Sequence, residues 1–443
     1  SGIGIIRISG PEAFDVADRI YRSKKGIKKL KEQPSHTIHY GYIADGDEII
    51  DEVLVMLMRG PHSFTAEDTV EVNCHGGVLA MKKVLETVIK YGARPAEPGE
   101  FTKRAFLNGR LDLSQAEAVM DVINAKNEFA LSSSIEQLNG RVSEKIKSLR
   151  EKIIYNIAFI ESALDDPEHI SIDGYSEKLS KILEEVNGEL SRLINNFDNG
   201  RIVKEGVKTV ILGKPNAGKS SLLNLLLGEE RAIVTDIEGT TRDTLEESIN
   251  LNGVFLNLID TAGIRDSEDV VEQIGVNKAK ELAEKSDLVI FVADASKELD
   301  ENDKEIINLI KDKQAIVLLN KSDLGTIINE KNVSEFDNKP VITFSAKTGD
   351  GLDELENKIR DLFYEGKVKY NDELYITNAR QKESLINAKN SIEEVIKSVE
   401  NDMPEDFYSI DLMDAYTYLG QIIGESVEDD LVNEIFSKFC MGK

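Results

Sequence analysis

The chain has little cysteine and histidine and no long hydrophobic run. Its two cysteines, Cys74 and Cys440, exclude a disulfide framework and favour a reducing compartment. These cysteines and the five scattered histidines have no zinc-ligand spacing. No apolar run reaches the roughly 18 residues that a membrane span needs, and the first residues show no signal-peptide pattern. We expect a soluble, cytoplasmic protein; because the sequence begins with Ser1 and not methionine, it leaves open whether residues precede it.

The chain also lacks an excess of positive charge. It carries 54 lysines and arginines against 81 acidic residues, which gives a formal net charge of −27. Phosphate contacts dominate nonspecific affinity for nucleic acids, so this balance argues against broad binding to a polyanion. A nucleic-acid partner then needs a second protein or a local basic patch, for which the candidate is Lys24, Lys25, Lys28, Lys29 and Lys31. A solvated loop or helix end is an equally good interpretation of that patch.

The length of 443 residues predicts two or three domains, and the apolar pattern locates them. Residues 1–108 mix apolar segments typical of strands with two stretches of helical spacing, so we expect a small α+β domain. Residues 109–205 and 367–443 have helical spacing, and residues 206–366 alternate strands and helices. The simplest architecture is one discontinuous helical domain into which an α/β domain with a mostly parallel sheet is inserted.

The segment GKPNAGKS at residues 213–220 is typical of a phosphate-binding loop, or P-loop. It follows an apolar run at 207–212 and opens a helical run at 221–227. A glycine-rich turn in that setting exposes successive backbone N–H groups, which bind phosphate oxygens together with the helix N-terminus. Lys219 can then reach the β- and γ-phosphates, and the Ser220 hydroxyl can bind Mg²⁺.

Two further motifs complete the metal side of the predicted site. The segment GTTRD at 239–243 supplies a threonine for the Mg²⁺ shell. The segment DTAG at 260–263 ends an apolar run at 254–259 and brings a carboxylate near the metal.

The last two motifs predict that the base is guanine. NKSD at 320–323 ends an apolar run, and Asp323 can accept two N–H bonds that adenine cannot supply in that geometry. SAK at 345–347 follows another apolar run and offers the Ala346 N–H to the base oxygen. A mismatched base leaves polar groups unpaired, so this recognition is strong. Any one motif could be a polar turn after a strand, but all five in this order predict a Ras-like G domain.

The residue after DTAG is Ile264, where many GTPases have a glutamine that orients the attacking water. An apolar side chain cannot orient water, so hydrolysis needs another group. Asn216 could bind a monovalent cation beside the phosphates, which would stabilise charge there. Glu272 is a candidate to polarise water, or else an ordinary acidic residue in the first turn of a helix. Arg242 and Arg265 are alternative charge stabilisers.

Several segments outside these motifs form a distinctive set. They are GIIRISG at 4–10, SFT at 63–65, HGG at 75–77, PGEFT at 98–102, RAFLN at 104–108, LDLSQAEA at 111–118 and FCMGK at 439–443. Together with the G-domain motifs, they resemble the MnmE (TrmE) family of tRNA-modification GTPases over essentially the whole chain.

The resemblance implies an N-terminal domain with the tetrahydrofolate-binding fold of glycine-cleavage aminomethyltransferases, which also forms the homodimer. It implies a heterotetramer with the flavoprotein MnmG that adds a carboxymethylaminomethyl or aminomethyl group to carbon 5 of the wobble uridine of certain tRNAs. The implied carbon source is 5-formyl-tetrahydrofolate or another tetrahydrofolate one-carbon carrier. Potassium stimulates GTP hydrolysis to GDP and phosphate in the family, and hydrolysis accompanies dimerisation of the G domains.

Carried onto this sequence, the resemblance assigns folate binding to Arg7, Glu71, Arg110 and Lys443. Two arginines and a lysine suit a glutamate tail and a polar pterin. The family often has lysine where Arg110 stands, which keeps the charge but changes the geometry. Met441 replaces the usual isoleucine, a swap of similar volume.

The resemblance also assigns the metal sites and the catalytic groups. Ser220 and Thr241 match the Mg²⁺ ligands, and Asn216, Thr235, Ile237 and Thr240 match the potassium shell. Glu272 matches the proposed catalytic glutamate, with Asn216 and Lys219 as the other catalytic residues. The GTP-binding residues are Asn216, Ala217, Gly218, Lys219, Ser220, Ser221, Thr235, Asp236, Ile237, Glu238, Gly239, Thr240, Thr241, Asp260, Thr261, Ala262, Gly263, Asn320, Lys321, Asp323, Ser345, Ala346 and Lys347.

Cys440 and Cys74 each have two interpretations. Cys440 is a nucleophile or acceptor for the one-carbon unit, or a small buried residue that packs the C-terminal helix, and the second is favoured because free cysteine is usually buried. Cys74 has the same ambiguity.

Two other functions compete with a tRNA-modifying GTPase. A ribosome-assembly or RNA-binding switch GTPase shares the G-domain motifs, but it predicts a basic RNA-binding module that the acidic composition opposes. A folate-responsive regulator without a tRNA role is the third possibility. The sequence does not indicate which tRNAs are used, whether glycine or ammonium supplies the nitrogen, or how hydrolysis is coupled to modification.

Overall fold

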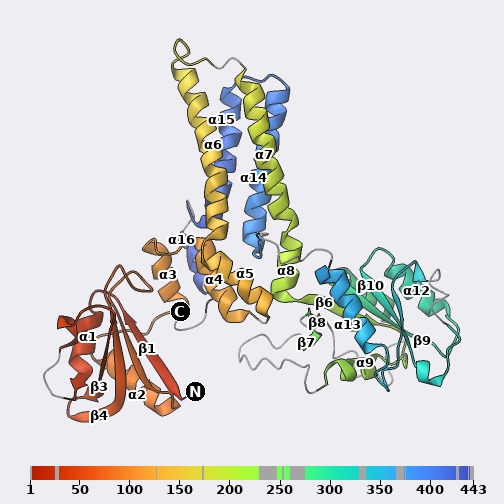
Figure 1. Cartoon of the computed structure of the whole chain (residues 1–443), viewed down its shortest axis with the longest axis horizontal. Helices are drawn as coiled ribbons and strands as arrows, with labels where there is room; N and C mark the ends of the chain where they lie inside the picture. The colour runs from red at the N-terminus through yellow and green to blue at the C-terminus, as the bar shows by residue number, and fades with distance from the viewer. Residues whose placement is uncertain are drawn as a thin grey trace. The chain divides into compact units, whose positions relative to one another are not determined.

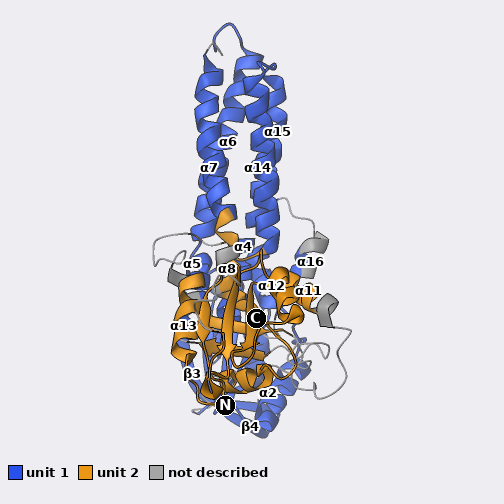
Figure 2. Ribbon diagram, turned by 90° about the vertical axis from the view of Figure 1, so that its right-hand side faces the viewer, with its two compact units in different colours: residues 1–194, 379–443 blue, residues 195–378 orange. Residues whose placement is uncertain are grey.

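A computed structural model describes residues 2–24, 29–125, 127–171, 174–228, 247–251, 254–259, 275–328, 336–365, 374, 376–425, 429–437 and 439. The chain divides into two compact units, one of residues 1–194 with 379–443 and one of residues 195–378 (Figure 2). The first unit is therefore discontinuous in sequence, and the second is inserted into it. The predicted boundaries at 108, 205 and 366 are finer than this division and stay predictions.

The first unit begins with a five-stranded antiparallel sheet. Its spatial order is β1 (Ile3–Ser9), β5 (Thr69–His75), β4 (Glu48–Met58), β3 (Thr37–Asp45) and β2 (Tyr21–Ser23). Helices α1 (Ala13–Ile20) and α2 (Val78–Lys90) cover the face that buries Ile8, Val55 and Val72. Because side chains alternate along a strand, Arg7 and Glu71 lie on the opposite face, where the register pairs them across β1 and β5.

The rest of the first unit is helical. It contains α3 (Glu100–Leu107), α4 (Leu113–Asn124), α5 (Glu128–Leu138), α6 (Arg141–Asp165), α7 (Tyr175–Asn195), α14 (Ala379–Glu400), α15 (Asp406–Ile423) and α16 (Asp429–Ser437). The long helices α6, α7, α14 and α15 run side by side as a bundle (Figure 1). The predicted cap of α4 is present, since Asp112 and Gln115 form a reciprocal capping box.

Two ion pairs, each with one buried member, join the two sequence segments of this helical part. Arg380, at the start of α14, donates from Nε and Nη2 to the two carboxylate oxygens of Glu117 in α4, at 3.0 and 3.1 Å. Arg150 in α6 pairs with Glu425 at 2.5 Å, and its guanidinium lies 3.9 Å from the centre of the Tyr416 ring. Loss of one partner would leave a buried charge unpaired, so these contacts favour one arrangement of the helices.

The second unit contains a six-stranded sheet of order β11 (Val341–Thr343), β10 (Ala315–Asn320), β9 (Leu288–Asp294), β6 (Val207–Leu212), β8 (Val254–Leu258) and β7 (Glu247–Leu251). All neighbours are parallel except β7 and β8. The helices of this unit are α8 (Phe197–Glu205), α9 (Lys219–Leu226), α11 (Gly275–Lys285), α12 (Glu301–Leu309) and α13 (Leu352–Arg360). Apolar clusters form on both faces, which explains why β9 and β10 are almost continuous apolar runs.

The predicted multidomain fold class is confirmed: an α+β part, a discontinuous helical part and an inserted α/β part with a P-loop. Among the described residues, no helix combines the length and apolar character that a membrane span requires.

Candidate functional site

The P-loop connects the end of β6 to the start of α9. Lys219 is the first residue of α9, and its ammonium donates to the carbonyl oxygens of Gly213 and Lys214 at 2.6 and 2.7 Å. Burial lowers the pKa of this lysine. The ammonium of Lys219 is therefore bound by the backbone of the P-loop. It can release these two carbonyl oxygens and bind phosphate oxygens in their place.

Two glycines in this loop cannot carry a side chain. A Cβ on Gly218 would lie 2.0 Å from Nδ2 of Asn320, and a Cβ on Gly213 would lie 2.4 Å from the Val292 carbonyl oxygen. The backbone of Gly218 has a φ of +103° and that of Asn216 a φ of +62°, both in the left-handed region. The loop can keep this conformation against Asn320 and Val292 only if both positions are glycine.

Asn320, at the end of β10, joins three of the predicted motifs. Its Nδ2 donates to the Ala217 carbonyl oxygen at 2.8 Å, and its Oδ1 accepts from the Ala346 N–H at 2.9 Å. The NKSD segment is thereby hydrogen-bonded to the P-loop on one side and to the SAK segment on the other.

The predicted base-reading residues lie on the same two segments. The Ser345 hydroxyl, which is fully buried, donates to Oδ1 of Asp323 at 3.0 Å and so orients that carboxylate. Lys321 adopts a φ of +66° and donates to Oδ2 of Asp294 at 2.7 Å. Asp294 ends β9, and the sequence interpretation missed it. Burial acts to raise the pKa of Asp294, but hydrogen bonds from Lys321 and Ser296 outweigh it and lower the pKa.

The described part of the chain therefore brings together the predicted P-loop, NKSD and SAK residues at the carboxyl ends of β6 and β10. Other predicted residues lie outside the described residues: Thr235, Asp236, Ile237, Glu238, Gly239, Thr240, Thr241, Asp260, Thr261, Ala262, Gly263, Glu272, Cys440 and Lys443.

A second polar cluster lies on the open face of the five-stranded sheet. Nε of Arg7 donates to Oε1 of Glu71 at 2.7 Å. Two guanidinium groups lie near the centre of the Phe64 ring, that of Arg7 at 5.2 Å and that of Arg110 at 4.9 Å, and the centre of the Phe101 ring lies 5.5 Å from the guanidinium of Arg7. Three of the four residues predicted to bind folate are thus in one cluster, together with two aromatic rings that the sequence interpretation did not assign.

Arg7 is held with part of its hydrogen-bonding capacity unused. Nη1 of Arg7 is buried and has no hydrogen-bond partner among the described residues. Nη1 of Arg110 donates to the Phe64 carbonyl oxygen at 3.0 Å, and burial lowers the pKa of this guanidinium. A buried donor without a partner is costly, which makes this cluster a candidate site for an anionic or polar ligand.

A network of partly buried and exposed polar groups supports the segment at residues 63–67, here called the strap, which carries Phe64. Ser9 donates to Glu67 at 3.0 Å, and Arg104 donates to the same Glu67 oxygen at 2.9 Å. Asn108 donates to the Thr65 carbonyl oxygen at 2.7 Å. These contacts explain why the segments SFT and RAFLN occur together, since the second segment holds the first in place.

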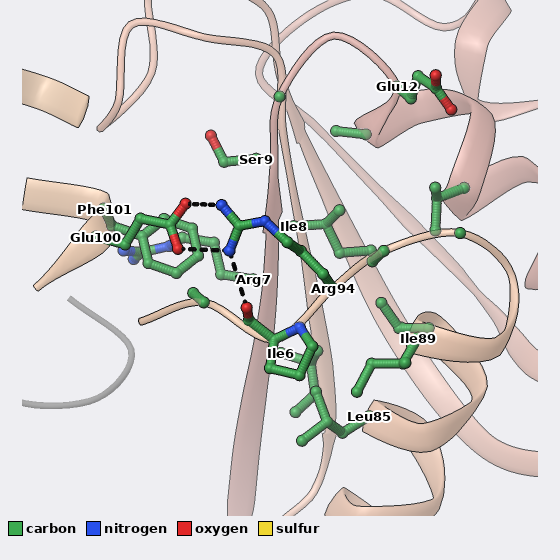
Figure 3. Close-up of a pocket in the computed structure, with 18 of the residues that line it drawn as sticks. Ile6, Arg7, Ile8, Ser9, Glu12, Leu85, Ile89, Arg94, Glu100 and Phe101 are labelled. Atoms are coloured by element: carbon green, nitrogen blue, oxygen red, sulfur yellow. Dashed lines mark hydrogen bonds and ion pairs between the residues drawn. The ribbon is translucent and has the colours of Figure 1, made fainter. Parts of the chain in front are cut away.

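A cavity of about 680 Å³ adjoins the cluster along β1 (Figure 3). Ile6, Ile8, Leu85 and Ile89 form its apolar wall, and Arg94 reaches across it to Glu100. The hydrogen bonds from Arg94, assisted by those from Arg104 and the Glu97 N–H, lower the pKa of Glu100 to about 2. Arg7 and Phe101 border this cavity as well as the aromatic cluster.

Comparisons with known proteins identify the family. A family model described as the MnmE helical domain matches residues 113–440, and one described as the GTP-binding protein TrmE N-terminus matches residues 1–110. A tRNA modification GTPase MnmE of Lachnoclostridium phytofermentans is 60% identical over 443 residues, which are 100% of this chain and 97% of that protein. The chain belongs to the MnmE family of tRNA modification GTPases.

Two further MnmE relatives are similarly complete. The protein of Acetivibrio thermocellus is 50% identical and that of Clostridioides difficile 48% identical, each over 100% of this chain and 96% of the relative. Among solved structures, the G domain of the T. maritima FeoB iron transporter is 25% identical over 35% of this chain and 97% of its own, with a TM-score of 0.26. Membership of the MnmE family favours a tRNA-modifying GTPase over a ribosome-assembly switch or a folate-responsive regulator.

In this MnmE family member, Phe436 and Phe439 pack against Gly99 and the start of α4. The Phe439 ring lies 5.0 Å from that of Phe436, and both residues are buried against Leu113. A Cβ on Gly99 would lie 2.5 Å from the Phe436 carbonyl oxygen and 2.8 Å from the Phe439 Cβ. Gly99 has a φ of +69°, so glycine is required where the C-terminal segment crosses the chain just before Phe101.

Cys74 is explained by ordinary packing, and two lysines of the basic segment make contacts within the first unit. Cys74 is buried and its thiol donates to the Gly4 carbonyl oxygen at 3.5 Å, and burial raises the pKa of the thiol. A thiol of this kind is unreactive. In the basic segment, Lys24 lies over the Tyr40 ring and Lys31 pairs with Asp15 at 2.6 Å, while Lys25 and Lys28 lie outside the described residues.

Proposed function

We propose that this MnmE family member hydrolyses GTP in its second unit and binds a tetrahydrofolate one-carbon carrier in its first unit. With the flavoprotein MnmG, it uses both to add a carboxymethylaminomethyl or aminomethyl group to carbon 5 of the wobble uridine of certain tRNAs. A homodimer, a heterotetramer with MnmG and a cytoplasmic location belong to the same proposal.

The observation that carries the folate part is the cluster of Arg7, Glu71 and Arg110 around Phe64. The buried and unpartnered Nη1 of Arg7 fits a carbonyl or carboxylate oxygen of a folate. The Glu71 carboxylate fits the N–H groups of a pterin ring, and the aromatic rings fit its flat face. The folate would supply the carbon unit, and these side chains would hold and orient it.

Lys443 belongs to the same proposed site. Lys443 lies four residues after Phe439, which packs on Gly99 next to α3. Four extended residues span at most about 14 Å. On the family resemblance, we include the Lys443 ammonium in the proposed folate site.

The nucleotide part rests on the P-loop geometry. The glycine positions let the loop adopt its tight conformation, Lys219 supplies a cation, and Asp323 is oriented to accept the guanine N–H groups. Ser220 and Thr241 would hold Mg²⁺, and Glu272 would polarise the attacking water.

Potassium would bind beside the phosphates through Asn216, Thr235, Ile237 and Thr240. The left-handed backbone of Asn216 supports this assignment, because it turns the P-loop sharply at the residue whose amide would bind the cation. GTP turnover measured at equal ionic strength should be well above the sodium rate when potassium is present, and equal rates would contradict the assignment.

Deletion of residues 440–443 tests the folate part. Calorimetry with 5-formyl-tetrahydrofolate should show at least about tenfold weaker binding by the truncated protein, because it loses the Lys443 charges from the pocket. Potassium-dependent GTP hydrolysis should persist, since the P-loop belongs to the second unit and the deleted residues belong to the first. Unchanged folate affinity would mean that the chain end serves another contact, such as the one with MnmG.

A further inference from the structure

A second lysine of the P-loop, Lys214, is anchored to α12. Its Nζ lies 2.8 Å from Oδ2 of Asp300 and 2.6 Å from Oδ2 of Asp303. Asp300 is the N-cap of α12, and Asp303 lies in its first turn. The side chain of Lys214 therefore joins the P-loop to the helix that follows β9, while Lys219 is the lysine placed for phosphates.

The backbone of Lys214 is fixed as well. Its carbonyl oxygen accepts from the Ala217 N–H at 3.3 Å and from Nζ of Lys219 at 2.7 Å. Asn216 adopts its left-handed conformation two residues later. A shift of Lys214 would thus displace both the phosphate-binding lysine and the residue proposed to bind potassium.

The negative charge of the buried Asp303 side chain is balanced by the ammonium of Lys214. Its side chain is almost fully buried, Oδ2 also accepts the Asp300 N–H at 3.1 Å, and Oδ1 has no hydrogen-bond partner among the described residues. Burial acts to lower the pKa of Lys214, but the two carboxylates outweigh it and raise the pKa. A buried carboxylate that loses its cation is strongly destabilised, so the pair has one preferred geometry.

We propose that Lys214 is a positioning residue of the GTPase site, whose ammonium fixes the P-loop to α12 and so sets the geometry in which the loop binds nucleotide phosphates. This inference rests on the proposed nucleotide site. Lys214 does not itself contact the nucleotide, which separates its role from that of Lys219.

The test is the dissociation constant of a fluorescent GDP analogue with the full chain. Lys214→Met should raise it about tenfold, because the loop is no longer held in its binding geometry. Asp303→Asn keeps an acceptor for the helix cap but removes the charge, and it should weaken binding in the same direction. The dissociation constant of the double variant should be at most about twofold higher than that of the weaker-binding single variant, because both changes break the same interaction.

Two controls keep the outcome clear. Lys214→Arg retains the cation and should restore the dissociation constant to within about threefold of the wild type. Lys285→Met removes a lysine from an exposed ion pair with Glu281 in the same unit and should leave it unchanged. A thermal unfolding curve is measured for each variant to check that the protein is folded at the assay temperature.

Two outcomes overturn the inference. If Lys214→Met binds GDP as tightly as the wild type, the contact with α12 stabilises the fold only. If Lys214→Met weakens binding but Asp303→Asn does not, Lys214 acts on the nucleotide directly. A wild-type protein that binds no GDP would instead overturn the proposed nucleotide site.

Discussion

The P-loop site and the Arg7–Phe64–Arg110 cluster are built in different ways. The P-loop itself is one short segment, and its conformation requires glycine at two positions where a Cβ would clash with Asn320 or Val292. The cluster uses side chains from β1, β5, the strap at residues 63–67 and the start of the helical part. A ligand bound by backbone groups depends on local conformation, whereas a ligand bound by side chains of separate segments depends on the tertiary fold.

The largest expected effect comes from Gly218→Ala. The new Cβ would meet Asn320 in a left-handed conformation that alanine disfavours, so GDP affinity should fall by at least about 100-fold. Gly228→Ala is the matched control, because its Cβ would meet only the Leu225 carbonyl oxygen at 3.4 Å. Calorimetry with GDP measures both, and a Gly218→Ala protein with normal affinity would show that the loop adjusts more freely than this geometry allows.

The side-chain cluster should respond more gradually. Arg7→Met removes the unpartnered Nη1 and the pair with Glu71, and affinity for 5-formyl-tetrahydrofolate should fall about tenfold. Arg19→Met, in which an exposed arginine loses its bond to the Tyr91 carbonyl oxygen, should have no effect on the same titration. Equal affinities of the Arg7→Met and Arg19→Met proteins would place the folate elsewhere.

The difference between a site on one short segment and a site of side chains from separate segments also explains what could be predicted from the sequence. Strands β6, β8 and β10 are apolar runs that end in polar motifs, so the G-domain site and most of its described residues followed from order and spacing. Strand β3 was not predicted, because its buried positions include His39 and Gly41, which interrupt the apolar alternation. Asp294 was missed because nothing in the local sequence shows that β9 ends beside Lys321.

The folate candidates were predicted only through the resemblance to a family. No spacing rule connects Arg7, Glu71 and Arg110, which meet because β1 and β5 are neighbours in the sheet. The proposed role of Phe64 depends on contacts with two arginines, Arg7 in β1 and Arg110 at the start of the helical part, that are far apart in the sequence. Such a constellation needs the tertiary structure before its residues can be grouped.

A smaller effect concerns stability near the cluster. The pKa of Glu100 is lowered to about 2 by Arg94, so its ionised form stabilises the folded state at a pH above its unfolded value of about 4.5. This stabilisation is lost as the pH falls from about 5 towards 2. Glu100→Gln should therefore cost on the order of 2 kcal/mol at pH 7 and much less at pH 3.

Urea unfolding of the wild type and the Glu100→Gln variant at both pH values measures this difference. A difference between the two proteins that stays constant with pH would show that Glu100 contributes through packing and not through its charge.

The central claim is that both sites serve one reaction on tRNA. The direct measurement is the content of 5-carboxymethylaminomethyluridine derivatives in bulk tRNA from a bacterial strain that lacks its own MnmE protein. We expect the wild-type chain to restore the modification, and both Arg7→Met and Gly218→Ala to restore much less of it at equal protein levels. Full restoration by either variant would contradict the claim, because it would show that the corresponding site is not needed for the modification.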